Sequence, residues 1–399
     1  MKDAKKNILI VMMNLYNGGA ERSLVNLLNT INYDKYNIDL LLFQKKGMFL
    51  KQLPDFVNIL DTPKDLQLLY NSSVGFKQII GSKNYLLLAH LLGRAFMVVD
   101  RKDMIRKKRQ IRWKYGYKKL LAVFPNTYDV ALGYIEGEPS YYVMDKVKAK
   151  KKYIWVHNDY TQTGLDKSYD QPYFEKADKI VTISEKCADI LKSEFPEQED
   201  KILYLPNISS KKLLKRRSEE NIPTEYDPTK FKVLSVGRLN PQKGFDIAIE
   251  AAAIFKKLNI PFQWIIIGEG KQRKYLQGLI DKYKLKSCVS LIGVKENPYP
   301  YMRLADILVQ SSRYEGKSVV LDEAKMLGLP VIATNYPTVR DQVNDQWGYI
   351  VDMNAKSIAE QLLYVSNNRN ELIKKKKLLV SLENNVNKQL SMYDDLLQS

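Results

Sequence analysis

Cysteine and histidine are scarce in this chain of 399 residues, which holds two of each. Cys187 and Cys288 lie far apart, and their spacing matches no metal-binding or redox motif. We therefore expect both to be core residues of a protein that keeps its thiols reduced, as cytosolic proteins do. Two histidines are too few for a metal site built from several imidazoles.

Long apolar runs are also missing, since no stretch reaches the roughly 18 consecutive apolar residues that a membrane-spanning helix needs. The nearest stretch, 85–99, is interrupted by His90, Gly93 and Arg94. The amino terminus superficially resembles a signal peptide, but its apolar run 8–13 is short and no small-residue cleavage site follows. We therefore expect a first buried strand there.

What the chain does have is positive charge: 63 Lys and Arg residues stand against 45 Asp and Glu residues, a formal net charge of +18. The charge is densest in 101–119, where aromatic side chains lie among the basic ones just after the apolar run 85–99. This combination suits the interface of an anionic membrane, and we predict membrane contact through residues 85–119. RNA binding and a merely solvated basic helix are the alternatives.

Runs rich in Ile, Leu and Val recur along the chain, with helical stretches between them. Continuous apolar runs of this kind are typical of parallel strands covered on both faces. The alternation predicts an α/β fold with two open sheets. The strands predicted for the first half are 7–13, 37–43, 129–135, 152–156, 179–183 and 202–205. Those predicted for the second half are 231–236, 263–267, 289–292, 306–310, 330–334 and 348–351.

A domain boundary is predicted after Pro206, where the chain becomes polar, charged and proline-bearing, as a connector should be. The amino-terminal domain would comprise residues 1–206 and the carboxy-terminal domain residues 207–383. The last helix, at about 384–399, would pack back on the amino-terminal domain.

Ligands of open α/β sheets bind at the carboxyl ends of the strands, so the loops that follow the strands matter most. After the first predicted strand, Gly18 and Gly19 allow the backbone to approach a ligand closely, although a plain turn would use them equally well. After the strand at 231–236, Arg238 and Lys243 share one loop before a helix. Two cations there suit a diphosphate, whereas either alone would more often be surface charge.

The stretch 311–334 holds Glu315 in a loop and Glu323 in the helix that follows. Ser318 is a suitable N-cap, and Gly328 is typical of the helix end. We predict that the amides of Gly316, Lys317, Ser318 and Val319 favour a phosphate, while the carboxylates accept hydrogen bonds from sugar hydroxyls. Solvent exposure of both carboxylates is the alternative. Val320, Ala324 and Leu327 would form the buried stripe of this helix.

Two further positions follow predicted strands. His157 ends the run 152–156 and would face the ligand edge of the sheet, although a lone histidine is often structural. Gly293 and Val294 follow the strand at 289–292 and could lie along a flat base.

Together, and in this order, these motifs resemble glycosyltransferase family 4. "GGAERSLVNL" is similar to the first glycine loop of that family, "VGRLNPQKGFDIAIEA" to its phosphate-binding loop, and "ISEKCADIL" to the run into its linker. "EGKSVVLDE" matches its pair of glutamates separated by seven residues. The resemblance covers nearly the whole chain and implies the GT-B fold, in which two Rossmann-like domains face a cleft.

The resemblance also implies roles. Arg238 and Lys243 would bind the donor diphosphate, Glu323 would accept hydrogen bonds from the ribose, and Glu315 would contact hydroxyls of the transferred sugar. His157 would lie near the reacting sugar, and Gly19 would let donor and acceptor approach. Many members have Gly-Phe-Gly or Gly-Phe-Pro after the first glutamate, whereas this chain has Gly316-Lys317-Ser318, which leaves the sugar open.

The family transfers sugars with retention of anomeric configuration, so we expect a retaining hexosyltransferase of cell-surface polysaccharide synthesis. No Asp-x-Asp triplet occurs in the chain, so positive side chains and helix amides would replace the usual metal at the diphosphate, and no cofactor is expected. UDP is favoured as the donor nucleotide, with GDP as the alternative. The acceptor would be a lipid-linked saccharide at the cytoplasmic face of the membrane.

Two other classes of function stay open. A nucleotide-sugar epimerase could use the same fold, and it would need no acceptor. A non-enzymatic nucleic-acid binder could use the charge of +18, although the ordered donor loops argue against it.

Neutralising Arg106, Lys107, Lys108 and Arg109 together should weaken flotation of the protein with anionic liposomes, because each basic residue near such a surface contributes about 1 kcal/mol. Flotation that is unchanged by the four substitutions would contradict membrane contact through residues 85–119.

Overall fold

The structure, a computed structural model, describes residues 4–16, 18–70, 109–208, 210–382 and 386–399. The chain divides into two compact units. The first comprises Met1–Tyr16, Leu27–Pro206 and Leu390–Ser399, and the second comprises Asn17–Asn26 and Asn207–Gln389. The boundary at Pro206 lies where the sequence changes character, but residues 17–26 lie with the second unit although they precede the boundary.

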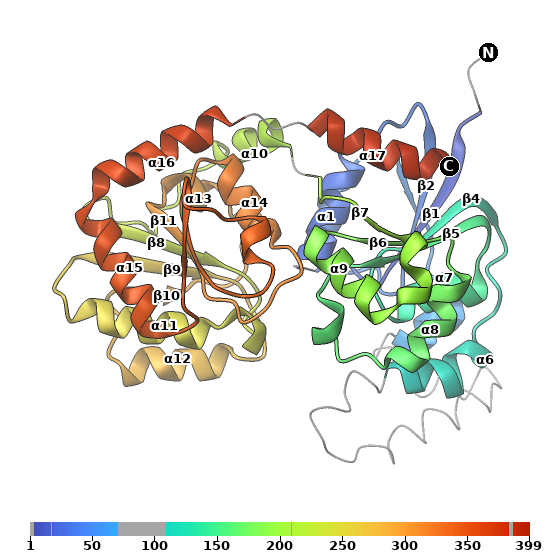
Figure 1. Cartoon of the computed structure of the whole chain (residues 1–399), viewed down its shortest axis with the longest axis horizontal. Coiled ribbons are helices and arrows are strands. Elements are labelled where there is room, and N and C mark those ends of the chain that lie inside the picture. The colour runs from blue at the N-terminus through green and yellow to red at the C-terminus, as the bar shows by residue number, and fades with distance from the viewer. Residues whose placement is uncertain (1–3, 17, 71–108, 209, 383–385) are drawn as a thin grey trace. The chain divides into compact units, whose positions relative to one another are not determined.

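The first unit is built on a seven-stranded sheet in the order β3-β2-β1-β4-β5-β6-β7, and all neighbouring strands are parallel (Figure 1). The sequence misses only β3, a three-residue edge strand with one buried residue, which leaves too short an apolar signal. The strands are β1 (Lys6–Met12), β2 (Tyr36–Leu42), β3 (Val57–Ile59), β4 (Thr127–Gly133), β5 (Lys148–Val156), β6 (Lys179–Thr182) and β7 (Ile202–Tyr204).

Both faces of this sheet are covered. Leu9 and Val11 of β1 belong to one hydrophobic core, and Ile8 and Ile10 between them are also buried, so successive side chains fill opposite faces. Cys187 is buried and unbridged, as expected of a core residue. The helices around the sheet are α2 (Lys64–Tyr70), α6 (Lys118–Leu120), α7 (Glu138–Lys146), α8 (Lys167–Lys176), α9 (Glu185–Glu194) and α17 (Val386–Gln398). Helix α1 (Gly19–Leu28) follows β1, and its residues up to Asn26 lie with the second unit.

The second unit has a six-stranded parallel sheet in the order β10-β9-β8-β11-β12-β13. All six strands were predicted from their apolar runs, with ends that differ by no more than one residue. The strands are β8 (Phe231–Val236), β9 (Phe262–Ile267), β10 (Val289–Leu291), β11 (Ile307–Gln310), β12 (Val331–Thr334) and β13 (Gly348–Val351). Cys288, just before β10, is buried, again as expected.

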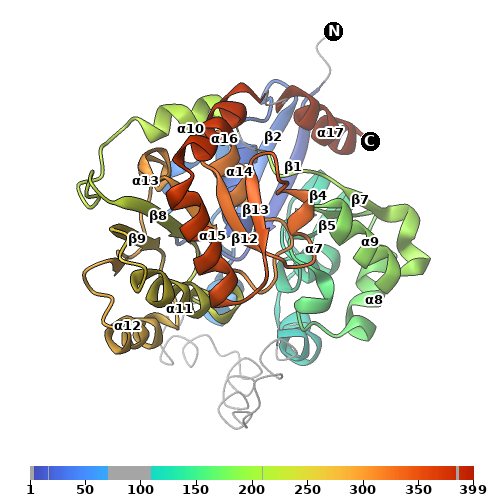
Figure 2. The same ribbon diagram turned by 60° about the vertical axis from the view of Figure 1, so that its left-hand side comes forward.

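Helices cover both faces of the second sheet, with a separate core on each (Figures 1 and 2). Trp264 and Ile266 of β9 enter one core, while Ile265 and Ile267 enter the other. One face is covered by α11 (Phe245–Lys256), α12 (Arg273–Lys282) and α15 (Ala355–Asn367). The opposite face is covered by α10 (Lys211–Ser218), α13 (Tyr299–Leu304), α14 (Val319–Met326) and α16 (Arg369–Ser381).

Each sheet reverses its strand order once, between β1 and β4 in the first and between β8 and β11 in the second. The connections on the two sides of such a switch point leave in opposite directions, which opens a crevice at the carboxyl ends of the strands. The loops that follow β8 and β11 are the two loops that the sequence predicts as a phosphate and sugar site. The topology therefore brings them to one place.

Helix α17 returns the end of the chain to the first unit. Tyr393 is buried, its ring stacks on Trp155 with centroids 5.9 Å apart, and its hydroxyl donates to the Pro206 carbonyl at 3.1 Å. This is the position predicted for the last helix. None of the helices that the structure describes is long and apolar enough to cross a membrane.

Tyr393→Ala should lower the free energy of unfolding of the first unit by about 3–5 kcal/mol, because it removes a fully buried aromatic ring. Tyr393→Phe should cost only about 1 kcal/mol, the net value of one hydrogen bond. Asp395→Ala, on the exposed side of α17, is the matched control. Urea denaturation measures all three, and equal midpoints for Tyr393→Ala and the control would show that α17 does not stabilise the first unit.

Candidate active site

The loops that follow β8 and β11 are joined at the switch point of the second sheet. Gly244 adopts a left-handed conformation with φ of 60°, and a Cβ there would lie 2.0 Å from the Ser311 carbonyl oxygen. Ser311 Oγ donates to the Lys243 carbonyl at 2.9 Å, and the Arg313 amide donates to the Gln242 carbonyl at 2.7 Å. Only glycine allows this approach, so Gly244 fixes the distance between the two loops.

Lys243 and Glu315 meet directly across the joined loops. Lys243 Nζ lies 2.6 Å from Glu315 Oε1, which also accepts a hydrogen bond from Ser312 Oγ at 2.6 Å. Thr338 Oγ1 donates to the Glu315 carbonyl oxygen at 2.8 Å and fixes the backbone. Glu315 is only 7% exposed. Solvent exposure, the alternative explanation for this carboxylate, is therefore wrong, and Lys243 is its ionic partner.

Arg238 is half exposed and pairs with Glu21 of α1, at 3.5 Å between Nη2 and Oε2. Gly18 lies against this pair, since a Cβ on Gly18 would lie 1.9 Å from Arg238 Nη2 and 2.0 Å from Glu21 Oε2. Gly19 is less restricted, because its Cβ would meet Val319 at an ordinary 3.7 Å. The first glycine loop therefore contacts the predicted phosphate-binding arginine through Gly18.

Glu323 is 2% exposed and lies in a buried polar cluster. Its Oε1 accepts a hydrogen bond from the Tyr299 hydroxyl at 2.7 Å and lies 3.6 Å from Arg22 Nε. Arg22 Nη1 donates to the same hydroxyl at 2.8 Å, and the guanidinium of Arg217 lies over the Tyr299 ring. Burial raises the pKa of the Glu323 carboxyl, and Arg22 opposes that rise.

The amino terminus of α14 begins as predicted, after Ser318, but the serine hydroxyl does not cap the helix. Ser318 Oγ donates instead to Gln310 Oε1 at 2.8 Å, and the Ser318 amide donates to Gln342 Oε1 at 2.7 Å. Gly316 and Ser318 are buried, and Lys317 is partly buried. Val319 and Ala324 are buried, and the predicted Val320 is partly buried and packs against the same core as Ala324. Leu327 is only partly buried.

The loops after β8, β9 and β10 form a hydrogen-bonded series beside the switch point. The Gly237 amide donates to the Ile267 carbonyl, and the Gly268 amide donates to the Gly293 carbonyl, each at 2.9 Å. Gly293 has φ of 77°, and Val294 beside it is partly exposed. These two predicted residues therefore belong to the same edge of the sheet as Arg238, two strands away.

His157 belongs to the first unit, at the carboxyl end of β5. Its amide donates to Glu136 Oε2 at 3.0 Å, and its ring lies 5.0 Å from that of Tyr134. Asn158 Nδ2 also donates to Glu136, at 2.5 Å to Oε1. Burial lowers the pKa of the His157 imidazole to about 3, so the ring is neutral at pH 7. Within the described residues its Nε2 is buried without a hydrogen-bond partner.

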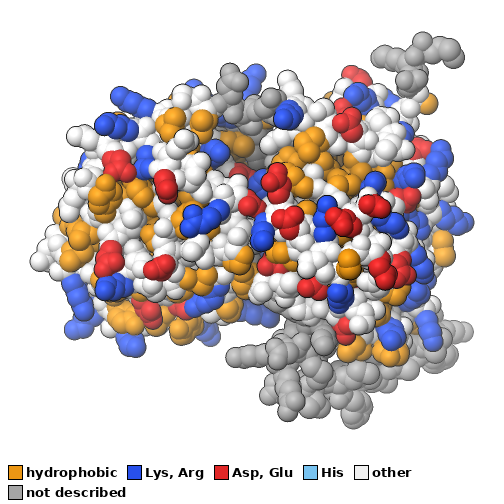
Figure 3. Space-filling model, viewed as in Figure 1, with side chains coloured by type: hydrophobic (Ala, Val, Ile, Leu, Met, Phe, Trp, Pro, Cys, Tyr) orange, Lys and Arg blue, Asp and Glu red, His pale blue; other side chains and the backbone are white. Residues whose placement is uncertain are grey.

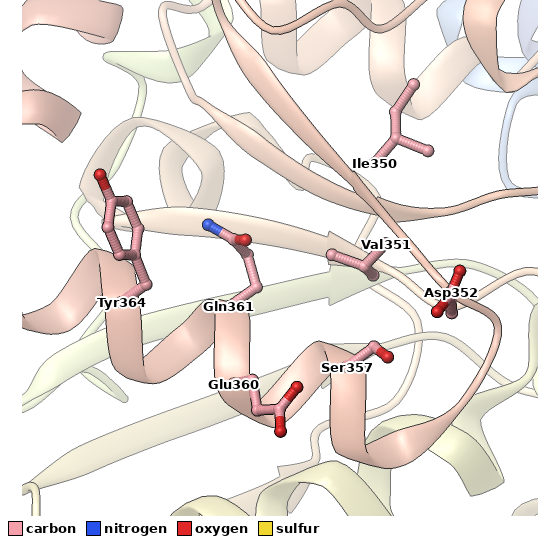
Figure 4. Close-up of a pocket in the computed structure, with 7 residues that line it drawn as sticks. All are labelled: Ile350, Val351, Asp352, Ser357, Glu360, Gln361 and Tyr364. Carbon is pink, nitrogen blue, oxygen red and sulfur yellow. The ribbon is translucent and has the colours of Figure 1, made fainter.

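A separate hollow of about 380 Å³ lies between β13 and α15 (Figure 4). Asp352, Ser357 and Glu360 are among its lining residues, and none of the residues predicted for the site is. In the described parts of the chain, no three His, Cys, Asp or Glu side chains gather as a possible metal site.

Sequence reasoning overlooked four partners of the predicted residues. Arg22 and Tyr299 surround Glu323, Gln342 binds the backbone of Ser318, and Glu136 binds that of His157. Arg22 stands inside the quoted glycine motif, and Glu136 follows a strand at the switch point of the first sheet. Their positions were therefore available as signals, whereas Tyr299 and Gln342 are brought to the site only by folding.

Two doubly wound parallel sheets, with glycine-bearing loops at their switch points, define the class of this protein as the GT-B fold of glycosyltransferases. The model of the family "Glycosyl transferases group 1" matches residues 216–385, which contain the joined loops and both glutamates.

Three curated relatives carry names of the same kind. An uncharacterized glycosyltransferase of Methanocaldococcus jannaschii is 27% identical over 59% of this chain and 64% of its own length. The putative colanic acid biosynthesis glycosyltransferase WcaL of Escherichia coli is 31% identical over 35% of this chain and 37% of its own length.

The third relative is from Campylobacter jejuni and is named an N-acetylgalactosamine-N,N'-diacetylbacillosaminyl-diphospho-undecaprenol 4-alpha-N-acetylgalactosaminyltransferase. It is 29% identical over 45% of this chain and 48% of its own length. The chain thus spans less than two thirds of the length of each of these relatives.

A solved structure supports the fold over the whole chain. The chain is similar to TarM of S. aureus, described in complex with fondaparinux, alpha-GlcNAc-glycerol and UDP, with a TM-score of 0.69 and 16% identity. The similarity covers 99% of this chain and 100% of TarM.

The His157 imidazole should stay neutral down to about pH 5, and its NMR signal should not titrate above that value. The pKa of His157 is about 3 in the folded protein and 6.5 in the unfolded chain. Its contribution to the free energy of unfolding is therefore fully present above pH 6.5 and is lost as the pH falls toward 3, because the unfolded chain takes up the proton first. The loss is at most about 1.4 kcal/mol per pH unit. His157→Gln should flatten the pH dependence of unfolding accordingly. A His157 signal that titrates near its ordinary pKa would contradict the buried environment.

Proposed function

We propose that the chain is a retaining glycosyltransferase of family 4 that transfers a hexose-type sugar from a nucleotide diphosphate sugar to a saccharide acceptor. Residues 1–206 would bind the acceptor and residues 207–383 the donor. The proposal rests above all on one observation: Lys243 and Glu315 lie 2.6 Å apart where two loops meet at the switch point of the second sheet. A cation for a diphosphate and a carboxylate for sugar hydroxyls are thus held at the edge where such sheets bind ligands.

Both predicted phosphate-binding cations are paired with carboxylates, Lys243 with Glu315 and Arg238 with Glu21. A diphosphate would offer each cation a more highly charged partner, and hydrogen bonds between oppositely charged groups are stronger than neutral ones. Glu315 would then be released to accept hydrogen bonds from sugar hydroxyls. Donor binding in this scheme is an exchange of partners at Lys243 and Glu315, in which the ammonium passes to the diphosphate and the carboxylate to the sugar hydroxyls.

Ribose recognition by Glu323 would require a similar exchange. Tyr299 and Arg22 hold its carboxylate in one orientation, and the ribose hydroxyls would replace or join the Tyr299 hydroxyl. Because burial raises the pKa of Glu323, the nearby guanidinium of Arg22 matters for keeping the carboxylate ionised. An ionised carboxylate accepts two ribose hydroxyls better than a protonated one does.

The transfer step would proceed on one face of the sugar. The bond between the anomeric carbon and the diphosphate oxygen breaks, the leaving phosphate takes the proton of the acceptor hydroxyl, and a new carbon–oxygen bond forms on the same face. Arg238, Lys243 and the amide dipoles of α14 would stabilise the negative charge that develops on the leaving group. Glu315 would position the sugar and stabilise positive charge at the anomeric carbon without attacking it.

His157 would contribute as a neutral group near the sugar. An imidazole that is not protonated cannot bring a second cation to the oxocarbenium-like centre, and its buried Nε2 is available for a hydrogen bond with a substrate hydroxyl. Gly18 and Gly19 would leave room for donor and acceptor beside Arg238.

We further propose a lipid-linked acceptor in the synthesis of a cell-surface polysaccharide such as a capsule, with the protein attached to the cytoplasmic face of the membrane. The names of the E. coli and C. jejuni relatives and the basic segment 101–119 support this. Residues 85–108 of the membrane segment predicted at 85–119 lie outside the described residues, and in the rest Trp113 and Tyr117 are buried in the core of the first unit and do not face a membrane. UDP is favoured as the nucleotide, which agrees with the UDP in the TarM complex.

Lys243→Met should lower kcat for sugar transfer by about 100-fold or more, because removal of one preorganised electrostatic contact to a transition state has that effect. Glu315→Gln should have an effect of similar size, since it removes the charge that faces the anomeric carbon. Lys257→Met, an exposed lysine after α11, is the matched control and should keep full activity. The assay measures transfer of labelled sugar from a panel of UDP- and GDP-sugars, and circular dichroism verifies folding.

Wild-type transfer rates in a folded Lys243→Met variant would overturn the proposed donor site. A sugar trapped covalently on Glu315 would overturn the one-face mechanism while leaving the activity class intact. Interconversion of donor sugars without an acceptor would favour an epimerase.

A further inference from the structure

Helix α16 in the second unit departs from the usual pattern of a surface helix, because it buries lysine as well as Leu372 and Leu379. A helix of this kind normally buries its apolar side chains and turns its lysines to solvent. The four consecutive lysines of α16, residues 374–377, split into two pairs: Lys375 and Lys376 point inward, and Lys374 and Lys377 are exposed. Three apolar side chains are exposed on the same helix, beside polar and basic ones.

The inward lysines anchor the helix to the body of the second unit. Lys376 Nζ donates to the Ala305 carbonyl at 3.0 Å, and Lys375 Nζ donates to the Asp345 carbonyl. Burial lowers the pKa of the Lys376 ammonium. These two lysines and the buried Leu372 and Leu379 fix the rotation of α16 about its axis, which leaves its other apolar side chains outside.

The outer face of α16 carries Ile373, Leu378 and Val380, which are 49%, 38% and 61% exposed. A single exposed apolar residue needs no explanation, but three on one helix that buries lysines form an apolar surface worth explaining. Lys374 and Lys377 lie among them. Figure 3 shows hydrophobic and basic side chains together over this part of the second unit.

Positive charge continues from α16 onto the adjacent helix α10. Lys211 of α10 donates to the carbonyl oxygens of Val380 and Leu382 at 2.7 and 3.0 Å, which ties the two helices together. The exposed residues of α10 are Lys212, Lys215 and Arg216. The helix itself has no acidic residue, although Glu219 and Glu220 follow it. The single carboxylate of α16, Glu371, accepts hydrogen bonds from Tyr349 and Tyr364.

We propose that the outer faces of α16 and α10 bind an anionic membrane surface. Ile373, Leu378 and Val380 would enter the boundary between headgroups and acyl chains, and the surrounding lysines and arginine would contact anionic headgroups. Long basic side chains can bury their stems while their charges stay at the headgroups, which fits lysines interspersed with apolar residues. This surface belongs to the second unit, is distinct from segment 85–119, and does not depend on the sugar transfer proposed above.

Binding of the full chain to vesicles tests the proposal. Vesicles of phosphatidylcholine with phosphatidylglycerol are compared with vesicles of phosphatidylcholine alone. The triple variant Ile373→Ser, Leu378→Ser, Val380→Ser should bind the anionic vesicles at least about tenfold more weakly, because it removes three apolar side chains from the interface. Lys374→Gln with Lys377→Gln should lower binding by about fivefold per lysine at low salt and by less at high salt.

The matched control is Ile254→Ser with Leu258→Ser, two exposed apolar residues at the end of α11 in the same unit. It should bind vesicles as the wild type does. Segment 85–119 is unchanged in every variant, so it contributes equally throughout. Sugar transfer to a water-soluble acceptor should be the same in all variants, which separates this proposal from the proposed reaction.

Two results would overturn the proposal. One is equal vesicle binding by the wild type and the triple variant, with both shown to be folded by thermal unfolding. The other is light scattering that shows a wild-type dimer and a monomeric triple variant, since a second copy of the chain would then cover α16.

Discussion

The close approach of the loops after β8 and β11 is the constraint on which the candidate site depends. Gly244 has no Cβ, so its backbone can lie against the Ser311 carbonyl, where any side chain would collide. The contact fixes the backbone of Lys243 relative to that of Glu315, and the ion pair follows from it. Both loops begin at neighbouring central strands, so the sheet holds the backbone of both charged residues in fixed positions.

Burial of charged side chains explains why the carboxylates of the candidate site have basic partners. Glu315 and Glu323 are both nearly inaccessible to water, and each has a basic side chain close to it. An unpaired carboxylate at either position would cost several kcal/mol, roughly 3–5 kcal/mol by the usual cost of breaking a buried pair. Segment 17–26 provides Arg22 for Glu323 and Glu21 for Arg238, which explains why it lies with the second unit.

The net charge of +18 is distributed in ways that composition does not reveal. Lys375 and Lys376 are used inside the second unit as anchors for α16, whereas Lys374 and Lys377 remain outside among apolar side chains. Four identical neighbours in the sequence therefore have two different functions. Helical geometry separates them, because successive residues point about 100° apart around the axis.

The sequence by itself determined the architecture. Twelve apolar runs marked strands that the structure contains, since a strand buried on both faces must be apolar throughout, and the glycine loops and the two glutamates marked the ligand edges. It could not show β3, whose three residues carry almost no pattern, or the inward direction of Glu323. Only the tertiary structure decided which side chains meet, such as Tyr299 with Glu323 and Gln342 with Ser318. The physical reason is that periodicity reports how each element buries its own side chains, whereas a site is made by contacts between elements that are distant in the chain.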